Sequence, residues 1–173
     1  MLVATSLLSI RAEDPEQPII MLTDKSNDAD IIQGLSLGAD DYVAKPFSVA
    51  QLVLRVQAVL RRARADLEPD HSLRFGEDVE VDLVNLGGRR CGQAVVFTRR
   101  EGELLQYLYA HRDRPVSRAE LLHKVWGYAR DLDLETRTVD IHIAKLRRKI
   151  EPDPARPRYL TTVRGAGYRL LAE

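Results

Sequence analysis

Cysteine and histidine, which often act as nucleophiles, bases or metal ligands, are sparse in this sequence. There is one cysteine, Cys91, and the four histidines show no paired metal-ligand spacing. A lone cysteine can form neither an internal disulfide nor a cysteine-based zinc site. We therefore predict a reducing compartment and no metal site built from cysteines or paired histidines.

Basic side chains, in contrast, are concentrated in two short stretches near the C-terminal end. The chain as a whole has 26 Lys and Arg against 26 Asp and Glu. Residues 137–149 nevertheless carry five basic side chains and one acidic one, and residues 156–169 carry four basic and no acidic ones. Such clusters on a neutral protein indicate a surface that binds a polyanion, although a solvated basic face is the commoner explanation of any single cluster.

The first basic stretch has the pattern of an amphipathic helix over about residues 135–150. At about 100° per residue, one stripe is apolar and must face the core: Val139, Ile143, Leu146 and Ile150. The opposite face then consists of Arg137, Ile141, Ala144, Lys145 and Arg148, with Thr138 and His142 on its flank. Forked donors beside small and β-branched side chains suit the major groove of DNA, where Arg or Lys can bond guanine and Ile141 can meet a thymine methyl group.

The second basic stretch reads as a strand, a glycine turn and a strand over residues 159–172. The turn places Arg164 at a tip, where an extended guanidinium can enter a minor groove. Thr162 and Tyr168 supply hydroxyls that can bond phosphates. Two basic elements next to each other favour a DNA-binding surface over a solvated face.

The elements that must position these residues fall into two groups, of which the first is α/β. The apolar run 18–23 is typical of a strand buried in a parallel sheet, and residues 41–44 form a second such strand. A helix follows each strand, and the second helix begins with the capping box 48–51. We expect a partial doubly wound domain over residues 1–63, in the order β-α-β-α, and a polar linker over residues 64–71.

The second group, residues 72–173, is predicted to be an α+β winged helix-turn-helix. Alternating apolar and polar residues over 73–97 indicate an N-terminal antiparallel sheet, with tight turns at Gly76, at Gly87-Gly88 and at Gly92. Capping boxes at 98–101 and 117–120 begin two helices, the basic helix is the third, and the terminal hairpin completes the domain.

Several motifs closely resemble the OmpR/PhoB-type two-component response regulators. TRTVDIHIAKLRRKIEP followed by YLTTVRGAGYRL is similar to their recognition helix and wing, and FTRREGELLQYL and VSRAELLHKVWG to the two preceding helices. PIIMLT and GADDYVAKPF resemble the second half of a receiver domain. The resemblance covers the chain from about residue 10 and implies an N-terminally truncated receiver followed by a winged-helix effector domain.

For the receiver part, the resemblance implies three switch residues. Thr23 matches the hydroxyl that contacts the phosphoryl group, Tyr42 the aromatic switch, and Lys45 the lysine that pairs with the phosphoryl group. The Lys45–Pro46 bond matches one that is usually cis. The phosphoacceptor aspartate and the Mg²⁺-binding acidic pair have no counterpart in this chain, and Asp24, Asp28, Asp40 and Asp41 are interpreted as solvated or pairing carboxylates.

For the effector part, the resemblance implies a DNA-contacting set. Arg137, Ile141 and Lys145 match groove-facing positions, and Arg164 matches the minor-groove position. Contacts to the DNA backbone are expected from Thr138, His142, Thr162 and Tyr168. Arg148 completes the predicted set. Trp126 is expected to be a core anchor, although its indole N–H can also reach a phosphate.

The resemblance also implies partners besides double-stranded DNA. Residues 24–62 match a homodimer face, loop 128–135 matches a segment that can touch RNA polymerase, and a sensor histidine kinase is implied only if the missing N-terminal half exists. No run of 18 apolar residues occurs, so no membrane span is expected. A sheet of two strands would leave one edge of the strand at 19–22 unpaired, a predicted site of pairing or aggregation.

We therefore interpret the chain as a cytoplasmic, sequence-specific DNA-binding transcriptional regulator of a two-component phosphorelay. Because the phosphoacceptor and the Mg²⁺-binding pair have no counterpart, we expect it not to be an enzyme and to hold no cofactor. The alternative is a receiver fragment that acts by forming heterodimers with intact regulators.

Overall fold

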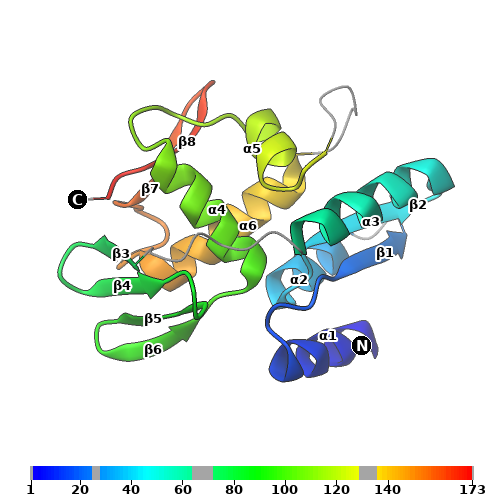
Figure 1. Ribbon diagram of the computed structural model, residues 1–173, viewed down its shortest axis with the longest axis horizontal. Helices are drawn as coiled ribbons and strands as arrows, with labels where there is room; N and C mark the ends of the chain where they lie inside the picture. The colour runs from blue at the N-terminus through cyan, green and yellow to red at the C-terminus, as the bar shows by residue number, and fades with distance from the viewer. Residues whose placement is uncertain (1, 25–27, 64–71, 129–135, 173) are drawn as a thin grey trace.

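The computed structural model describes residues 2–24, 28–63, 72–128 and 136–172 (Figure 1). The predicted linker, residues 64–71, and all of the predicted polymerase-contacting loop except Tyr128 lie outside the described residues. Two groups of elements are visible. A partial receiver lies on the right of Figure 1, and a winged-helix domain lies on the left.

The described residues of the partial receiver form five elements. They are α1 (Leu2–Glu13), β1 (Ile20–Asp24), α2 (Asp28–Leu37), β2 (Asp41–Lys45) and α3 (Val49–Ala63). The predicted order β-α-β-α is present, and β1 and β2 pair in parallel with Thr23 opposite Ala44. Helix α1 was not predicted, because its apolar and polar residues are mixed without the periodicity of an amphipathic helix.

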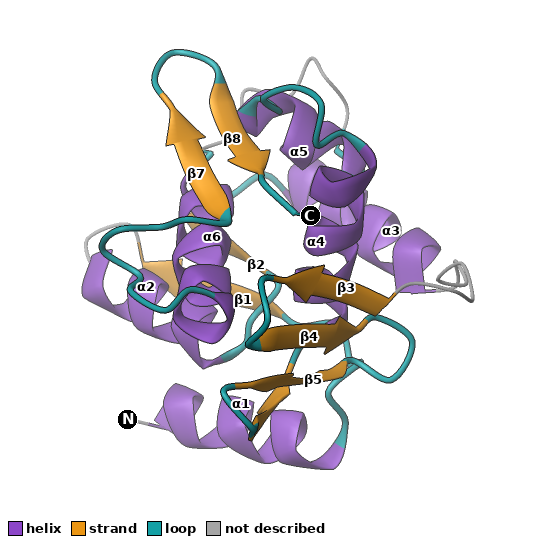
Figure 2. Ribbon diagram, turned by 90° about the vertical axis from the view of Figure 1, so that its left-hand side faces the viewer, coloured by secondary structure: helices purple, strands orange, loops and turns teal. Residues whose placement is uncertain are grey.

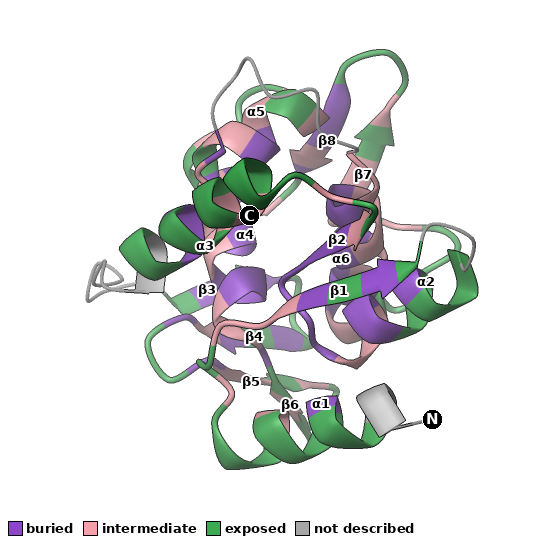
Figure 3. Cartoon of the chain, turned by 90° about the vertical axis from the view of Figure 1, so that its right-hand side faces the viewer, coloured by how far each residue is buried: buried purple, intermediate pink, exposed green. Residues whose placement is uncertain are grey.

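The core of the partial receiver is small. Helices α1 and α2 pack against each other beside the sheet, and the buried cluster is Leu7, Met21, Ile31, Leu35, Ala39 and Tyr42. Within the described strands, β1 pairs only with β2, so its other edge is open as predicted (Figure 3). Helix α3 leaves much of its apolar surface exposed, at Val49, Val53, Leu54, Val56 and Leu60.

The winged-helix domain begins with a four-stranded antiparallel sheet. Its strands, in spatial order, are β3 (Ser72–Phe75), β4 (Val79–Asp82), β5 (Gly87–Arg90) and β6 (Gln93–Val96). The predicted turn at Gly87-Gly88 is wrong, because both glycines lie within β5. A β-carbon at Gly88 would collide with the carbonyl oxygen of Glu80 on β4, so this glycine serves close strand packing and not chain reversal.

Three helices follow among the described residues, as predicted: α4 (Arg99–Ala110), α5 (Arg118–Lys124) and α6 (Arg137–Ile150). Thr98 forms the predicted capping box with Glu101 at the start of α4. Ser117 caps α5 by accepting a hydrogen bond from the backbone N–H of Glu120. The predicted apolar stripe of α6 is buried along its whole length, at Val139, Ile143, Leu146 and Ile150.

The terminal hairpin is also as predicted, with β7 (Leu160–Val163) paired antiparallel to β8 (Gly167–Leu170) (Figure 2). Glu151, which is fully buried just after α6, fixes its base. The Glu151 carboxylate accepts hydrogen bonds from the backbone N–H groups of Arg158, Tyr159 and Leu160, at 2.7, 2.9 and 2.7 Å. The wing is therefore held in a fixed position relative to the end of α6.

Among the described residues, no helix is both long and apolar enough to cross a membrane.

Candidate nucleic-acid interface

The tip of the wing presents one basic side chain to solvent. Arg164 is exposed and precedes Gly165, whose φ of +74° lets the chain reverse there. Thr162 is exposed on β7, and its hydroxyl accepts a hydrogen bond of 2.8 Å from Arg147 Nη2. Arg147 Nε also donates to the carbonyl oxygen of Leu160, at 2.9 Å. Arg147, which was not among the predicted site residues, therefore connects α6 to the wing.

The C-terminal half of α6 offers a second exposed guanidinium, that of Arg148. Arg90 on β5 donates to the carbonyl oxygens of Arg148 and Pro152, at 2.8 and 3.3 Å. These bonds satisfy carbonyl groups that have no partner inside the helix. Arg148 and Arg164 are the two predicted arginines that the structure leaves open to a ligand.

Tyr168, expected to contact phosphate, is buried on β8. Its hydroxyl donates to Asp140 Oδ1 at 2.6 Å and accepts from Arg118 Nη2 at 2.9 Å. Burial and the bond to Asp140 raise the pKa of Tyr168 to about 12. The expectation of a free hydroxyl is wrong here, because Asp140 and Arg118 already use it.

Lys145 was expected on the exposed face of α6, and this expectation is also wrong. Its Nζ lies 3.2 Å from Glu101 Oε1, and Lys149 Nζ lies 2.6 Å from Glu101 Oε2. Glu101 is completely buried, and although burial alone raises its pKa, the two lysines lower that pKa to about 2. A buried carboxylate needs positively charged partners, so the Lys145 side chain lies against Glu101 at the start of α4.

Thr138 and His142 are buried as well, contrary to expectation. His142 Nδ1 lies 2.8 Å from the carbonyl oxygen of Thr138, and its ring meets the Trp126 ring edge-on at 5.2 Å. Burial, reinforced by the charge of Lys145, lowers the pKa of His142 to about 3, so the ring is neutral. The Thr138 hydroxyl has no hydrogen-bond partner among the described residues.

The N-terminal half of α6 packs against the partial receiver. Arg137 Nη1 lies 2.7 Å from Asp28 Oδ1 at the start of α2. Ile141 packs against the small apolar cluster of the partial receiver, and α2 lies beside α6 (Figure 2). Two of the three predicted groove-facing residues, both partly exposed, thus contact another part of the same chain.

A second contact between the two parts involves the start of β2. The indole N–H of Trp126 donates to the carbonyl oxygen of Asp40 at 2.9 Å, so Trp126 is the predicted core anchor and its donor is occupied. The Tyr128 hydroxyl donates to Asp41 Oδ2, which also lies 2.6 Å from Arg55 Nη1. The Arg55 guanidinium stacks over the Tyr128 ring at 5.1 Å.

These contacts show how the acidic residues around β2 are used. Asp40 is bound by Arg11 at 2.9 Å, and Asp41 by Arg55. Both carboxylates are buried, so they pair as predicted and are not solvated. Burial raises the pKa of Asp40 in spite of the nearby arginines. Part of the predicted dimer face is therefore used within one chain.

The predicted switch residues lie at one end of the two-stranded sheet. The register places Thr23 opposite Ala44 and Asp24 opposite Lys45, at the C-terminal ends of the two strands. Thr23 is buried, Lys45 is exposed, and Tyr42 lies inside the apolar cluster. The Lys45–Pro46 bond is cis, as the resemblance implies. Within the described residues, no group of three or more acidic, histidine or cysteine side chains could hold a metal ion.

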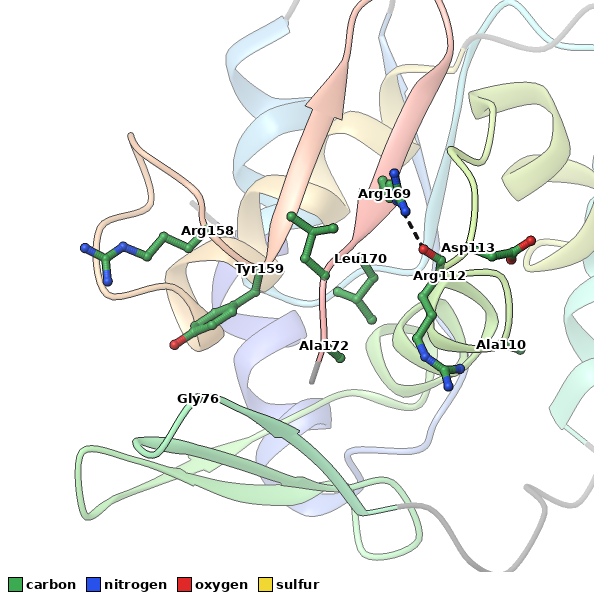
Figure 4. A pocket seen from close by; sticks show the side chains of 10 residues that line it. Gly76, Ala110, Arg112, Asp113, Arg158, Tyr159, Arg169, Leu170 and Ala172 are labelled. Atoms are coloured by element: carbon green, nitrogen blue, oxygen red, sulfur yellow. Dashed lines mark hydrogen bonds between the residues drawn. The ribbon is translucent and has the colours of Figure 1, made fainter.

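A surface hollow of about 890 Å³ lies at the base of the wing (Figure 4). Its lining includes Gly76, Arg112, Arg158 and Leu171, and Arg169 Nε donates to the carbonyl oxygen of Arg112 at 3.1 Å. It contains none of the predicted DNA-contacting residues.

A basic helix followed by a wing, joined to a receiver-like α/β part, defines a transcriptional response regulator. Residues 4–57 match the response regulator receiver domain family, and residues 92–170 match the family of transcriptional regulatory proteins, C terminal. The chain belongs to the response regulators that combine these two domains, the OmpR/PhoB type indicated by its motifs.

Two curated relatives and one solved structure support this assignment. The sensory transduction protein RegX3 of Mycobacterium leprae (strain TN) is 42% identical over 158 residues, which are 88% of this chain and 77% of RegX3. The probable transcriptional regulator ycf27 of Guillardia theta is 41% identical over 160 residues, and the match spans 90% of this chain but only 63% of that protein. A structure of a RitR mutant is similar with a TM-score of 0.67 and 25% identity, over 97% of this chain and 72% of that one.

Proposed function

We propose that this chain is a sequence-specific regulator of transcription in a two-component system, which binds double-stranded DNA with α6 in the major groove and the wing in an adjacent minor groove. The observation that carries the proposal is the fixed pairing of a basic helix with a basic wing. Arg147 connects α6 to β7, and Glu151 holds the base of the wing, so Arg148 and Arg164 are presented from one rigid unit.

The charge of this unit supports DNA as the ligand. Arg148 and Arg164 are exposed, and Arg147 lies on the same half of α6 as Arg148. Arginine can bond guanine edges in a major groove, and it is favoured by the negative potential of a narrow minor groove. Family membership adds that the domain belongs to transcriptional regulators. The alternative of a receiver fragment that only binds intact regulators has no comparable support.

Further roles are proposed from the family pattern. We expect the chain to work in the cytoplasm without catalysis and without a cofactor, to dimerise through residues 24–62, and to contact RNA polymerase through loop 128–135. A histidine kinase would act on it only through a complete receiver. The aromatic start of that loop, Tyr128, is buried against Asp41, so polymerase contact would fall on the remaining loop residues.

The test is selection of duplexes from a random library with the full chain, followed by fluorescence anisotropy on the enriched duplex across a salt series. We expect an enriched sequence whose affinity exceeds that of a shuffled duplex and falls steeply as salt rises. Failure to enrich any sequence, with no duplex binding even at low salt, would contradict the proposal.

A further inference from the structure

The surface hollow of about 890 Å³ at the base of the wing takes no part in the proposed DNA interface (Figure 4). Pockets of about 300–1,000 Å³ that combine apolar walls with a few polar groups are typical of small-molecule sites. We propose that this hollow binds a small molecule that carries a phosphate group on an aromatic body, which is the chemistry of a nucleotide. The inference goes beyond the proposed function, because it requires no contact with DNA.

Four described segments that are distant in the sequence form the walls of the hollow. They are the β3–β4 turn at Gly76, residues 110–113 at the end of α4, residues 158–159 before β7, and residues 169–172 at the end of β8. The backbone N–H of Leu171 donates to the carbonyl oxygen of Tyr159 at 2.7 Å. Arg169 Nε donates to the carbonyl oxygen of Arg112 at 3.1 Å. These bonds fix three of the four walls relative to one another, so the hollow is formed before a ligand arrives.

Guanidinium groups give part of the lining its positive charge. Arg112 and Arg169 both line the hollow, and Arg112 extends along the side opposite Tyr159 (Figure 4). Among the described residues, the Arg112 guanidinium bonds only the carbonyl oxygen of Tyr109, through Nη1 at 3.0 Å. The two terminal nitrogens of Arg169 have no partner in the described part of the chain. Both arginines therefore keep N–H groups for a ligand, and a guanidinium fork matches the oxygens of a phosphate.

The charge balance of the described lining also favours an anion. Arg158 and Asp113 line the hollow as well, and both side chains extend away from Ala172, which lies near its centre (Figure 4). Their opposite charges offset each other at a distance. The positive charges of Arg112 and Arg169 remain uncompensated.

Apolar surface completes the lining. Leu171 is 45% exposed and lines the hollow together with Ala172. The ring of Tyr159 packs against Phe75 at 5.5 Å, and its hydroxyl lies so close to Gly76 that a β-carbon there would be 2.7 Å from the oxygen. That hydroxyl has no hydrogen-bond partner among the described residues. A flat ring with polar edges would cover the exposed leucine and bond the hydroxyl.

These two kinds of surface together select the ligand. A bare phosphate would satisfy Arg112 and Arg169 but leave Leu171 uncovered, and a neutral nucleoside would cover Leu171 but leave the arginines without an anion. A nucleotide does both. Because the hollow contains none of the predicted DNA-contacting residues, a nucleotide there leaves Arg148 and Arg164 accessible.

The first experiment titrates the full chain with ADP, adenosine and pyrophosphate in an isothermal titration calorimeter. We expect ADP to bind most tightly and the other two about tenfold or more weakly, because each lacks one of the two parts that the hollow recognises. Equal affinity for ADP and pyrophosphate would show unselective binding of anions by arginines and overturn the inference. Absence of ADP binding would overturn it as well.

Two variants test the location of the site. Ala172→Trp fills the hollow with an indole ring, and Arg112→Gln removes one guanidinium. Ala94→Trp and Arg89→Gln are the matched controls, because they make the same changes at exposed positions on β6 and β5. We expect each hollow variant to weaken ADP binding about tenfold or more, and each control to bind as the native protein does. Native affinity in either hollow variant, or an equal loss in the controls, would contradict the assignment.

The closing experiment locates the nucleotide in the native chain, so it depends on the folding of no variant. Nitrogen–proton correlation spectra are recorded with increasing ADP. We expect the largest shifts at the amide groups of Gly76, Ala110 and Leu171, with no shift at Gly165 on the tip of the wing. Shifts that fall outside the hollow, such as at Arg148 and Gly165, would overturn the inference and leave the proposed function intact.

Discussion

In the structure, Arg164 has the position and the exposure that the sequence predicts for it. It lies at the tip of the wing, where it was expected, and is exposed. We expect Arg164→Ala to weaken binding to the enriched duplex by about 1–3 kcal/mol, measured by anisotropy at fixed salt. Arg74→Ala, which removes an exposed arginine from β3, is the control. Equal effects of the two substitutions would contradict a specific role for the wing.

The burial of His142 predicts that the free energy of unfolding depends on pH. Its pKa is lowered to about 3 in the folded protein from 6.5, by burial first and by Lys145 second, while Glu101 acts in the opposite direction. Between these values the unfolded chain binds a proton that the folded protein does not. The stability linked to His142 is therefore fully present above pH 6.5 and falls by about 1.4 kcal/mol per pH unit below it.

The measurement is urea unfolding between pH 5 and 7.5. Native protein should lose stability below pH 6.5, and His142→Gln should lose much less over the same interval. His111→Gln, at the end of α4, should leave the His142 contribution in place. An unchanged slope in His142→Gln would show that this histidine is not the group responsible.

At the scale of elements, the wing depends on the carboxylate of Glu151. This side chain accepts three backbone N–H groups at the base of β7. In Glu151→Gln an amide NH₂ faces one or more of these donors, so we expect a loss of about 1–3 kcal/mol in the free energy of unfolding. Glu77→Gln, an exposed change in the β3–β4 turn, should have little effect. Denaturant unfolding followed by circular dichroism measures both.

Local patterns predicted the winged-helix elements well. The Thr98 capping box, the buried stripe from Val139 to Ile150 and the hairpin each depend on residues close together in the sequence, so spacing alone was enough. The turn predicted at Gly87-Gly88 was wrong, because close packing against Glu80 and a tight turn both require glycine. Sequence spacing cannot distinguish these two reasons.

The candidate site was only partly predictable for a different reason. Lys145 forms an ion pair with the buried Glu101, which lies 44 residues earlier in the chain. The Tyr168 hydroxyl donates a hydrogen bond to Asp140, which lies 28 residues earlier. Helical periodicity correctly excluded Lys145 from the core stripe, but it carries no information on what covers the opposite face. That information resides in the tertiary contacts with α2 and α4.

At the scale of the whole molecule, the partial receiver exposes surface that a larger sheet would cover. The outer edge of β1 is unpaired among the described strands, and Val53 and Leu60 on α3 are about half exposed, at 46% and 52%. Open edges and contiguous apolar patches favour association. We expect native protein to increase in mass with concentration in light scattering.

Charged residues on α3 should suppress this association. The double variant Val53→Glu with Leu60→Glu should remain monomeric over the same concentrations, while Val84→Glu, an exposed valine of the winged-helix domain, should behave as the native protein does. A native chain that is monomeric throughout would contradict both this expectation and the proposed dimer through residues 24–62.

The inclusion of Ile141 in the packing of the partial receiver has a consequence for synthesis. Strands β1 and β2 leave the ribosome about a hundred residues before Ile141 does, which at about 5–20 residues per second is a delay of roughly 5–20 s. During that interval the nascent N-terminal segment lacks the surface that completes its packing. Ribosome-associated chaperones would therefore meet this segment first, and its final docking must follow translation of the last helix.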